Sequence, residues 1–176
     1  MILVLSKRQK KAQAEYKNKG FVIIDVTSKS DDCRFKKFSP FFPHGDIPIP
    51  GMEGSFAESV EGIWQGLKVF EKEGPDRSKF VIKNMKNIKR SSNKRGRVLG
   101  HSFQNKLLSY VDARKCIYLP SYHWFLQNKL QDEIELVRDL MNKGNNVVLL
   151  DYETNEDIDD VSKPLSHASL IKRCLM

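Results

Sequence analysis

Two short apolar runs along the chain have the pattern of buried β-strands. They are "FVIIDV", Phe21–Val26, and "NVVLLDY", Asn146–Tyr152, which are rich in branched aliphatic residues and short for a helix. A further short strand is predicted over Cys116–Leu119. Asp25 and Asp151 stand at the ends of the two runs. A carboxylate there either lines a site in a mixed α/β fold or caps a turn, and the pattern leaves both open.

The stretch "SFAESVEGIWQGLKVFEKEGP" predicts an amphipathic helix from about Phe56 to Lys72. Ser55 and Glu58 fit a capping box, and Gly74 with Pro75 supplies a stop signal. Apolar residues recur at intervals of three and four, as on the buried face of a helix: Val60, Ile63, Leu67 and Phe70.

A polar stripe runs beside this apolar one. Glu58, Glu61, Gln65 and Lys68 follow each other at intervals of three, four and three, which places them on one side of the predicted helix. Such a stripe usually faces solvent, where a Glu–Lys attraction contributes about 0.2–0.5 kcal/mol. The helix pattern alone does not exclude the alternative, a row of functional groups.

The remaining segments predict three helices, a loop and a turn. Four prolines in Phe38–Gly54 exclude a regular helix, and the aromatic residues there indicate a loop that packs on the body or walls a cleft. A basic helix is expected over Arg77–Lys89, followed by a flexible turn over Arg90–Arg97. A long helix is expected from about Tyr122 to Asn142, and a last one near Ser166–Leu175.

These elements predict an α+β fold, a predominantly helical single domain with a small β-sheet. A length of 176 residues suits one domain with a sizeable core. Residues 1–20 are expected to form a peripheral basic segment, and residues 153–163 a peripheral acidic loop.

The distribution of charge suggests an anionic ligand. The net charge is +8, and no acidic residue lies between Asp76 and Asp112, whereas Lys and Arg crowd the first part of that interval. This asymmetry indicates either a face that attracts phosphates, nucleotides or nucleic acid, or a solvated basic surface without a ligand.

The cysteines and the apolar runs bear on metal binding, secretion and membrane insertion. Cys33, Cys116 and Cys174 are widely spaced, without a metal-binding pattern, so free thiols and no metal or cofactor are predicted. The apolar N-terminal residues precede the basic cluster, the reverse of a secretory signal, and no apolar run approaches the ~20 residues that span a bilayer. We therefore expect a cytoplasmic protein without a membrane partner, monomeric or weakly homo-oligomeric.

Two motifs in Phe38–Arg97 resemble the NADAR family. That family carries a loop of the type S-N-F-Y-P and then a helix of the type S-V-E-H-x-x-Q-A-x-K-F, and Gly96-Arg97 is similar to a later family element. The loop is matched by Ser39, Phe41, Phe42 and Pro43, and the helix by Ser59, Val60, Glu61, Gln65, Lys68 and Phe70.

The chain also departs from the family pattern. Gly62 stands where the family usually has His, Gly66 stands where it usually has Ala, and Val69 is an extra residue before the final Phe of the motif. The C-terminal Trp-Gly element is missing, since Trp124 is the last tryptophan. These differences are typical of a divergent branch or of a relative with another substrate.

The resemblance implies an N-glycosidase-like hydrolase acting on an ADP-ribose-containing or related ribosyl phosphate compound, including removal of ADP-ribose from guanine in nucleic acid. Glu61 would stabilise the cationic sugar and activate water. Lys68 would serve as an amine nucleophile or as a phosphate-holding cation. The expected substrate-binding residues are Phe41, Phe42, His44, Trp64, Gln65, Arg95 and Arg97.

Two other function classes remain open. One is a non-catalytic nucleotide or nucleic-acid binding protein that uses the basic face; its binding would be steeply salt-dependent and would survive loss of Glu61. The other is a protein-interaction module that presents the acidic loop Asp151–Asp160 to a basic partner.

Overall fold

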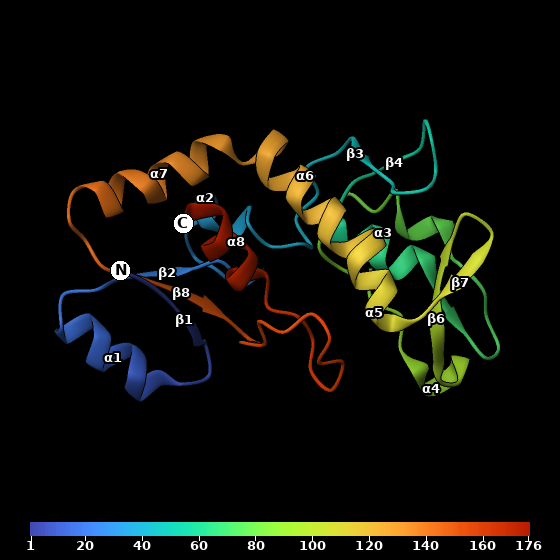
Figure 1. Cartoon of the computed structure of the whole chain (residues 1–176), viewed down its shortest axis with the longest axis horizontal. Coiled ribbons are helices and arrows are strands. Elements are labelled where there is room, and N and C mark those ends of the chain that lie inside the picture. Colours follow the sequence, from blue (N-terminus) through green and yellow to red (C-terminus); the bar gives the residue numbers. More distant parts are fainter. The chain divides into compact units, whose positions relative to one another are not determined.

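The computed structural model describes all 176 residues and has a mixed α+β fold, with 39% helix and 19% strand in small sheets (Figure 1). The predicted α+β class is confirmed, although helix does not clearly dominate. The chain divides into two compact units. Unit 1 contains residues 1–39 and 126–176, and unit 2 contains residues 40–125.

Unit 1 is built on a three-stranded parallel sheet of order β1-β8-β2. Its strands are β1 (Ile2–Ser6), β2 (Val22–Asp25) and β8 (Val147–Asp151), and helix α1 (Lys10–Asn18) connects β1 to β2. All five residues of β8 are buried, and the first four are aliphatic, as is typical of a central parallel strand. The two main predicted strands are thus confirmed. Residues 1–20, expected to be peripheral, supply a strand of the sheet.

The helices of unit 1 match the sequence prediction in part. Besides α1, they are α2 (Cys33–Lys36), α7 (Gln131–Asn142) and α8 (His167–Leu175). The last predicted helix is confirmed, with Ser166 as its cap. The long helix predicted up to Asn142 is instead two helices, α6 (Leu119–Lys129) and α7, because Leu130 leaves the helical conformation and is fully buried.

Unit 2 contains two small antiparallel sheets and several short helices. One sheet pairs β3 (Ile47–Pro48) with β4 (Phe56–Ala57), and the other has the order β5-β6-β7. The other elements are β5 (Lys68–Phe70), β6 (Val98–Phe103), β7 (Lys106–Leu108), α3 (Val60–Leu67), the 3₁₀ turn Arg77–Lys79, α4 (Ser92–Arg95), α5 (Tyr110–Ala113) and the π-helical turn Arg114–Tyr118, which leads into α6.

The predicted helix Phe56–Lys72 is correct only in its centre. Ser59, not Ser55, caps α3 by accepting a hydrogen bond from the Gly62 N–H, while Phe56 belongs to β4. The helix ends at Leu67, and Lys68–Phe70 continues as a strand. The apolar stripe is nevertheless buried as predicted.

Two other predictions were wrong. The segment Cys116–Leu119 is helical, because the π-helical turn joins α5 to α6 and Pro120 is tolerated in the first turn of the latter. The segment Arg77–Lys89 forms only the single turn Arg77–Lys79. The Phe80 carbonyl there accepts a hydrogen bond from the Glu58 N–H and so does not propagate a helix.

Every helix is too short or too polar to span a lipid bilayer.

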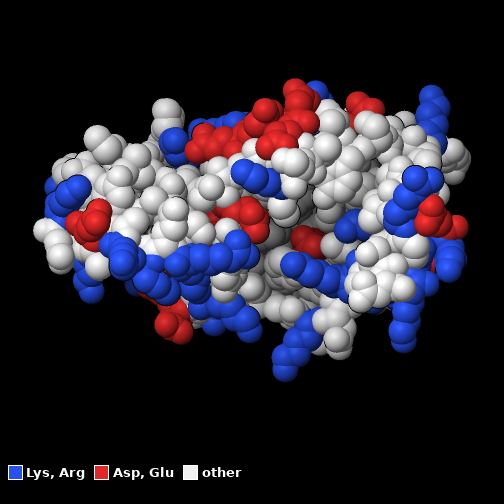
Figure 2. Space-filling view, turned by 90° about the horizontal axis from the view of Figure 1, so that it is seen from below, with Lys and Arg blue, Asp and Glu red and all other residues white.

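On the face seen in Figure 2, Lys and Arg side chains occur over both the left and the right part, with acidic side chains among them. Several cations of the basic segment are paired locally: Lys79 with Asp76, Lys83 with Glu58, Arg90 and Arg95 with Glu73, and Arg97 with Glu71. The segment is therefore less positive than its sequence alone suggests.

Candidate functional site

Glu61, Gln65 and Lys68 form a hydrogen-bonded row. The Gln65 Nε2 donates to Glu61 Oε1 over 2.8 Å, and the Lys68 Nζ donates to Gln65 Oε1 over 3.2 Å. Their exposed fractions are 8%, 5% and 8%. The solvent-facing interpretation of the polar stripe is therefore wrong, and an acid, an amide and an amine are buried together.

Two distant segments cover the row and fix its geometry. The Glu61 N–H donates to the Pro40 carbonyl, and the Arg90 N–H donates to Gln65 Oε1 over 3.0 Å. A backbone N–H can only donate, so the Gln65 oxygen must face Arg90 and its amide nitrogen must face Glu61. Both ends of this amide are engaged within the protein. Gln65 thus links the acid to the amine, whereas the sequence predicted that it binds substrate.

Arg90 is a residue that sequence reasoning missed. Its guanidinium is fully buried and donates to the carbonyls of Gln65, Lys68 and Gly74 and to the Glu73 carboxylate. It thereby satisfies carbonyl groups at the end of α3 and in the strand that follows. Nothing in the sequence distinguishes this arginine from its basic neighbours.

The pKa of the Lys68 ammonium is lowered. Burial is the main cause, the Glu61 carboxylate opposes the shift, and the nearby Arg90 and Lys89 charges add to it. More of the Lys68 side chain is therefore the neutral amine at a given pH than for a surface lysine. A neutral amine can act as a nucleophile, which an ammonium cannot.

His101 lies opposite Lys68 in the β5–β6 pairing. Its ring is fully buried and packs on Trp64 with 3.8 Å between ring centroids, and neither ring nitrogen has a hydrogen-bond partner of good geometry. Burial and then the Lys68 charge lower the pKa of His101 to about 3, although the Trp64 backbone weakly opposes the shift. The imidazole is therefore neutral. No pattern in the sequence distinguishes this residue.

Tyr110 completes the aromatic group around the row. Its ring meets Trp64 edge-on at 5.4 Å between centroids, and Arg114 lies over its face. Burial raises the pKa of the Tyr110 hydroxyl, Arg114 opposes this, and the Glu61 charge adds to it. The hydroxyl therefore stays protonated close to Glu61.

The predicted aromatic residues take different positions. Trp64 is 7% exposed and packs inside this group, which agrees with a core role. Phe41 is half-buried beneath the Lys89 ammonium, at 5.3 Å from the ring centroid. Phe42 packs on His44, which in turn contacts Phe125 edge-on.

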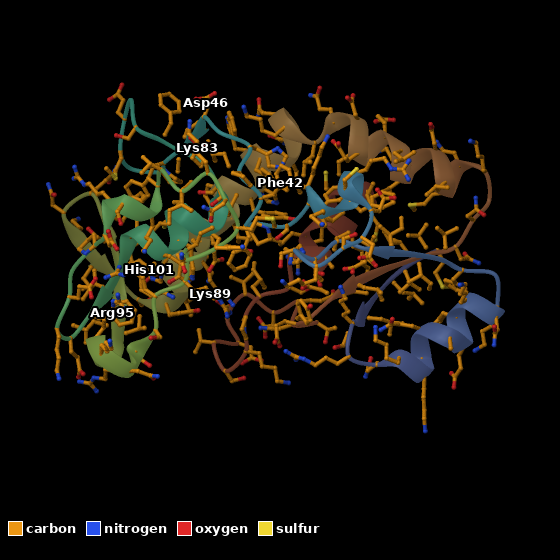
Figure 3. All side chains as sticks on the ribbon, turned by 180° about the vertical axis from the view of Figure 1, so that it is seen from behind. Phe42, Asp46, Lys83, Lys89, Arg95 and His101 are labelled. Atoms are coloured by element: carbon orange, nitrogen blue, oxygen red, sulfur yellow. The ribbon has the colours of Figure 1, made fainter.

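Arg95 and Arg97, which were expected to bind substrate, pair with glutamates outside the row. Arg95 pairs with Glu73 over 2.5 Å and Arg97 with Glu71 over 2.7 Å. Figure 3 shows Arg95, the last residue of α4, apart from Lys89. No contact joins either arginine to the Glu61–Gln65–Lys68 row.

The two glycines that depart from the NADAR pattern have one physical cause. A Cβ atom on Gly62 would lie 2.7 Å from the Lys79 carbonyl oxygen, and one on Gly66 would lie 2.2 Å from the Phe80 ring. The segment around Lys79 and Phe80 therefore packs directly on α3. Neither the His nor the Ala of the family motif would fit there without movement of this segment.

The strand-end carboxylates in unit 1 have structural partners. Asp25 pairs with Lys7 at the end of β2. Asp151 accepts hydrogen bonds from Ser166 Oγ and the Ala168 N–H and pairs with His167. Of the two interpretations, capping and pairing is the one observed for Asp151. No group of three or more His, Cys, Asp or Glu side chains is arranged to hold a metal ion.

Fold and site together define a mixed α+β protein with a buried acid–amide–amine row, whose acid and amide lie on α3 and whose amine begins β5. The chain belongs to the Family of unknown function (DUF6939), whose model matches residues 6–171. The match includes strands β2 and β8 of unit 1 and the whole row in unit 2. A comparison with curated proteins gives no match.

Proposed function

We propose that this protein is an N-glycosidase-like hydrolase that acts on an ADP-ribose-containing or related ribosyl phosphate compound. The observation that carries the proposal is the buried row of Glu61, Gln65 and Lys68. A buried acid and a buried amine cost free energy, so their joint placement is more typical of a reactive site than of a structural helix face.

Glu61 supplies the carboxylate that the chemistry needs. Cleavage of an N-glycosidic bond develops positive charge on the sugar, which a carboxylate beside the anomeric carbon stabilises. The same carboxylate can accept a proton from the attacking water. Gln65 holds one of its oxygens by donating a hydrogen bond, which keeps the carboxylate oriented with little reorganisation.

Lys68 has two compatible roles. As a neutral amine it can add to the aldehyde carbon of an opened ribose, with loss of water, to form an imine that water later hydrolyses. As an ammonium it can hold a phosphate group. Its lowered pKa favours the first role.

The NADAR resemblance supports the substrate class. Glu61 and Lys68 are the motif positions that meet in the row, and the loop motif lies next to them through the Pro40 carbonyl. ADP-ribose attached to guanine in nucleic acid is the specific substrate we propose to test first. Phe41 and the cations nearby suit an anionic nucleotide.

The test is an incubation of the purified chain with an ADP-ribosylated guanine oligonucleotide and with ADP-ribose conjugates, followed by mass spectrometry. Glu61→Gln should abolish release of ADP-ribose while most ligand affinity remains, and Lys68→Ala should reduce it at least tenfold. Glu58→Gln is the matched control, since Glu58 lies outside the row and pairs with Lys83. Absence of turnover on every conjugate, with ligand binding indifferent to Glu61 and Lys68, would leave a basic binding module as the better description.

A further inference from the structure

The cations in the basic segment differ in whether an acidic side chain of the protein already pairs with them. Arg90 is buried on backbone carbonyls and Glu73, and Arg95 and Arg97 are paired with glutamates. Lys89 is exposed, and no acidic side chain lies within ion-pair distance of it. Its charge is therefore available to a ligand.

The backbone of Lys89 is held in place by its two chain neighbours, Ile88 and Arg90. Ile88 is 1% exposed, and Arg90 donates its N–H to Gln65 Oε1. The side chain of Lys89 is thus presented from a fixed point, although the residues before it form no regular helix. Its charge is also close enough to contribute to the lowered pKa of Lys68.

Phe41 positions the Lys89 ammonium. The Nζ lies 5.3 Å from the ring centroid, within the range of a cation–π contact. Phe41 follows Pro40, whose carbonyl accepts the Glu61 N–H. The ammonium and its aromatic platform therefore belong to residues that directly neighbour Arg90 and Pro40, whose backbones hydrogen-bond to Gln65 and Glu61 of the row.

We infer that Lys89, positioned on the Phe41 ring, binds a phosphate group of the ligand whose sugar reaches the Glu61–Gln65–Lys68 row. This assigns the phosphate-binding role to Lys89 in place of Arg95 and Arg97. The identity of the sugar rests on the proposed function, but the anion site does not. A lysine with free N–H donors binds phosphate as a point charge.

The test compares Lys89→Ala with Lys94→Ala by calorimetric titration. Lys94 is an exposed lysine on α4, so its variant carries the same charge change without the Phe41 contact. The probes are pyrophosphate, ADP-ribose and adenosine. Lys89→Ala should weaken pyrophosphate and ADP-ribose binding about 10- to 100-fold and leave adenosine unchanged, as expected for loss of one charge-assisted contact. Lys94→Ala should change each affinity less than about twofold.

A second variant tests the platform. Phe41→Leu keeps an apolar side chain but removes the ring face, and should weaken pyrophosphate binding several-fold. Equal effects of Lys89→Ala and Lys94→Ala, or no pyrophosphate binding by the unmodified chain, would overturn the assignment.

The two proposals fail in different ways. Glu61-dependent release of ADP-ribose with an unchanged KM in Lys89→Ala would keep the hydrolase and reject the Lys89 site. Lys89-dependent binding of pyrophosphate without any turnover would keep the anion site and reject the hydrolase.

Discussion

At the scale of single residues, the low pKa of His101 predicts that the folded chain loses stability in acid. Its folded pKa of about 3 lies below the ordinary value of 6.5. A depressed histidine pKa means that the unfolded chain binds the proton more tightly, so the contribution of His101 to stability is full above pH 6.5 and is lost as pH falls towards 3. His101→Leu removes this loss. Its free energy of unfolding, relative to the unmodified chain, should rise by about 2 kcal/mol between pH 7.5 and pH 5.

Urea unfolding at the two pH values measures this difference, and any change in packing cancels because it is present at both. His123→Leu at an exposed position is the control and should show no such change. A difference between His101→Leu and the unmodified chain that is independent of pH would contradict the neutral, unpartnered state of the ring.

The candidate site could be predicted only in part at this scale. The intervals between Glu61, Gln65 and Lys68 correctly placed three groups in one row. Their burial could not be predicted, because it depends on Pro40 and Arg90, which come from 21 residues before Glu61 and 25 residues after Gln65. His101 was missed because only strand pairing brings it opposite Lys68.

At the scale of elements, the contact between α3 and the segment after it should be sensitive to one methyl group. Gly66→Ala places a Cβ 2.2 Å from the Phe80 ring, so the segment must move or the helix must shift. We expect a loss of about 1–3 kcal/mol in the free energy of unfolding, despite the higher helix propensity of alanine. Thermal or urea unfolding measures it.

Gly74→Ala is the matched control, because a Cβ there would meet no atom within 4 Å. Phe80→Leu combined with Gly66→Ala should recover part of the loss, since it shortens the opposing side chain. Equal stability of the Gly66 and Gly74 variants would show that Phe80 does not press on α3.

The elements that sequence predicted well are those whose signal is local. The strands β2 and β8 and the helix α8 follow from apolar runs and a serine cap. The helix expected over Arg77–Lys89 does not form, because the Phe80 carbonyl accepts a hydrogen bond from the distant Glu58 N–H and Ile88 is buried in the core. Propensity is overridden where long-range contacts satisfy the backbone.

At the scale of the whole molecule, the free energy of unfolding should also decrease at alkaline pH, because of His167. The His167 Nδ1 lies 2.9 Å from Asp151, and the Nε2 lies 2.9 Å from the Val26 carbonyl oxygen, which can only accept. Both nitrogens therefore carry protons, and the cation joins the ends of β2 and β8 to the start of α8. Burial lowers the pKa of His167, but the Asp151 charge and these hydrogen bonds outweigh it, so the pKa is raised.

A raised histidine pKa stabilises the fold fully below the unfolded value of 6.5, and this contribution is lost as pH rises through the folded value. For Asp151 burial raises the pKa, but the His167 charge and hydrogen bonds lower it overall, so its contribution is lost only in acid, below about 3.8. His167→Asn should therefore cost about 3 kcal/mol at pH 6, as expected for a broken buried pair, and less at pH 9.

Urea unfolding of both chains at pH 6 and pH 9 checks this, with His123→Asn as the exposed control. A cost that stays constant or grows towards pH 9 would show that His167 is neutral in the folded chain. The expected result would mean that the two histidines make stability depend on pH in opposite directions. His101 in unit 2 loses its stabilising contribution in acid, and His167 in unit 1 loses its contribution in alkali. Stability would then be greatest near neutral pH, where neither contribution is substantially lost.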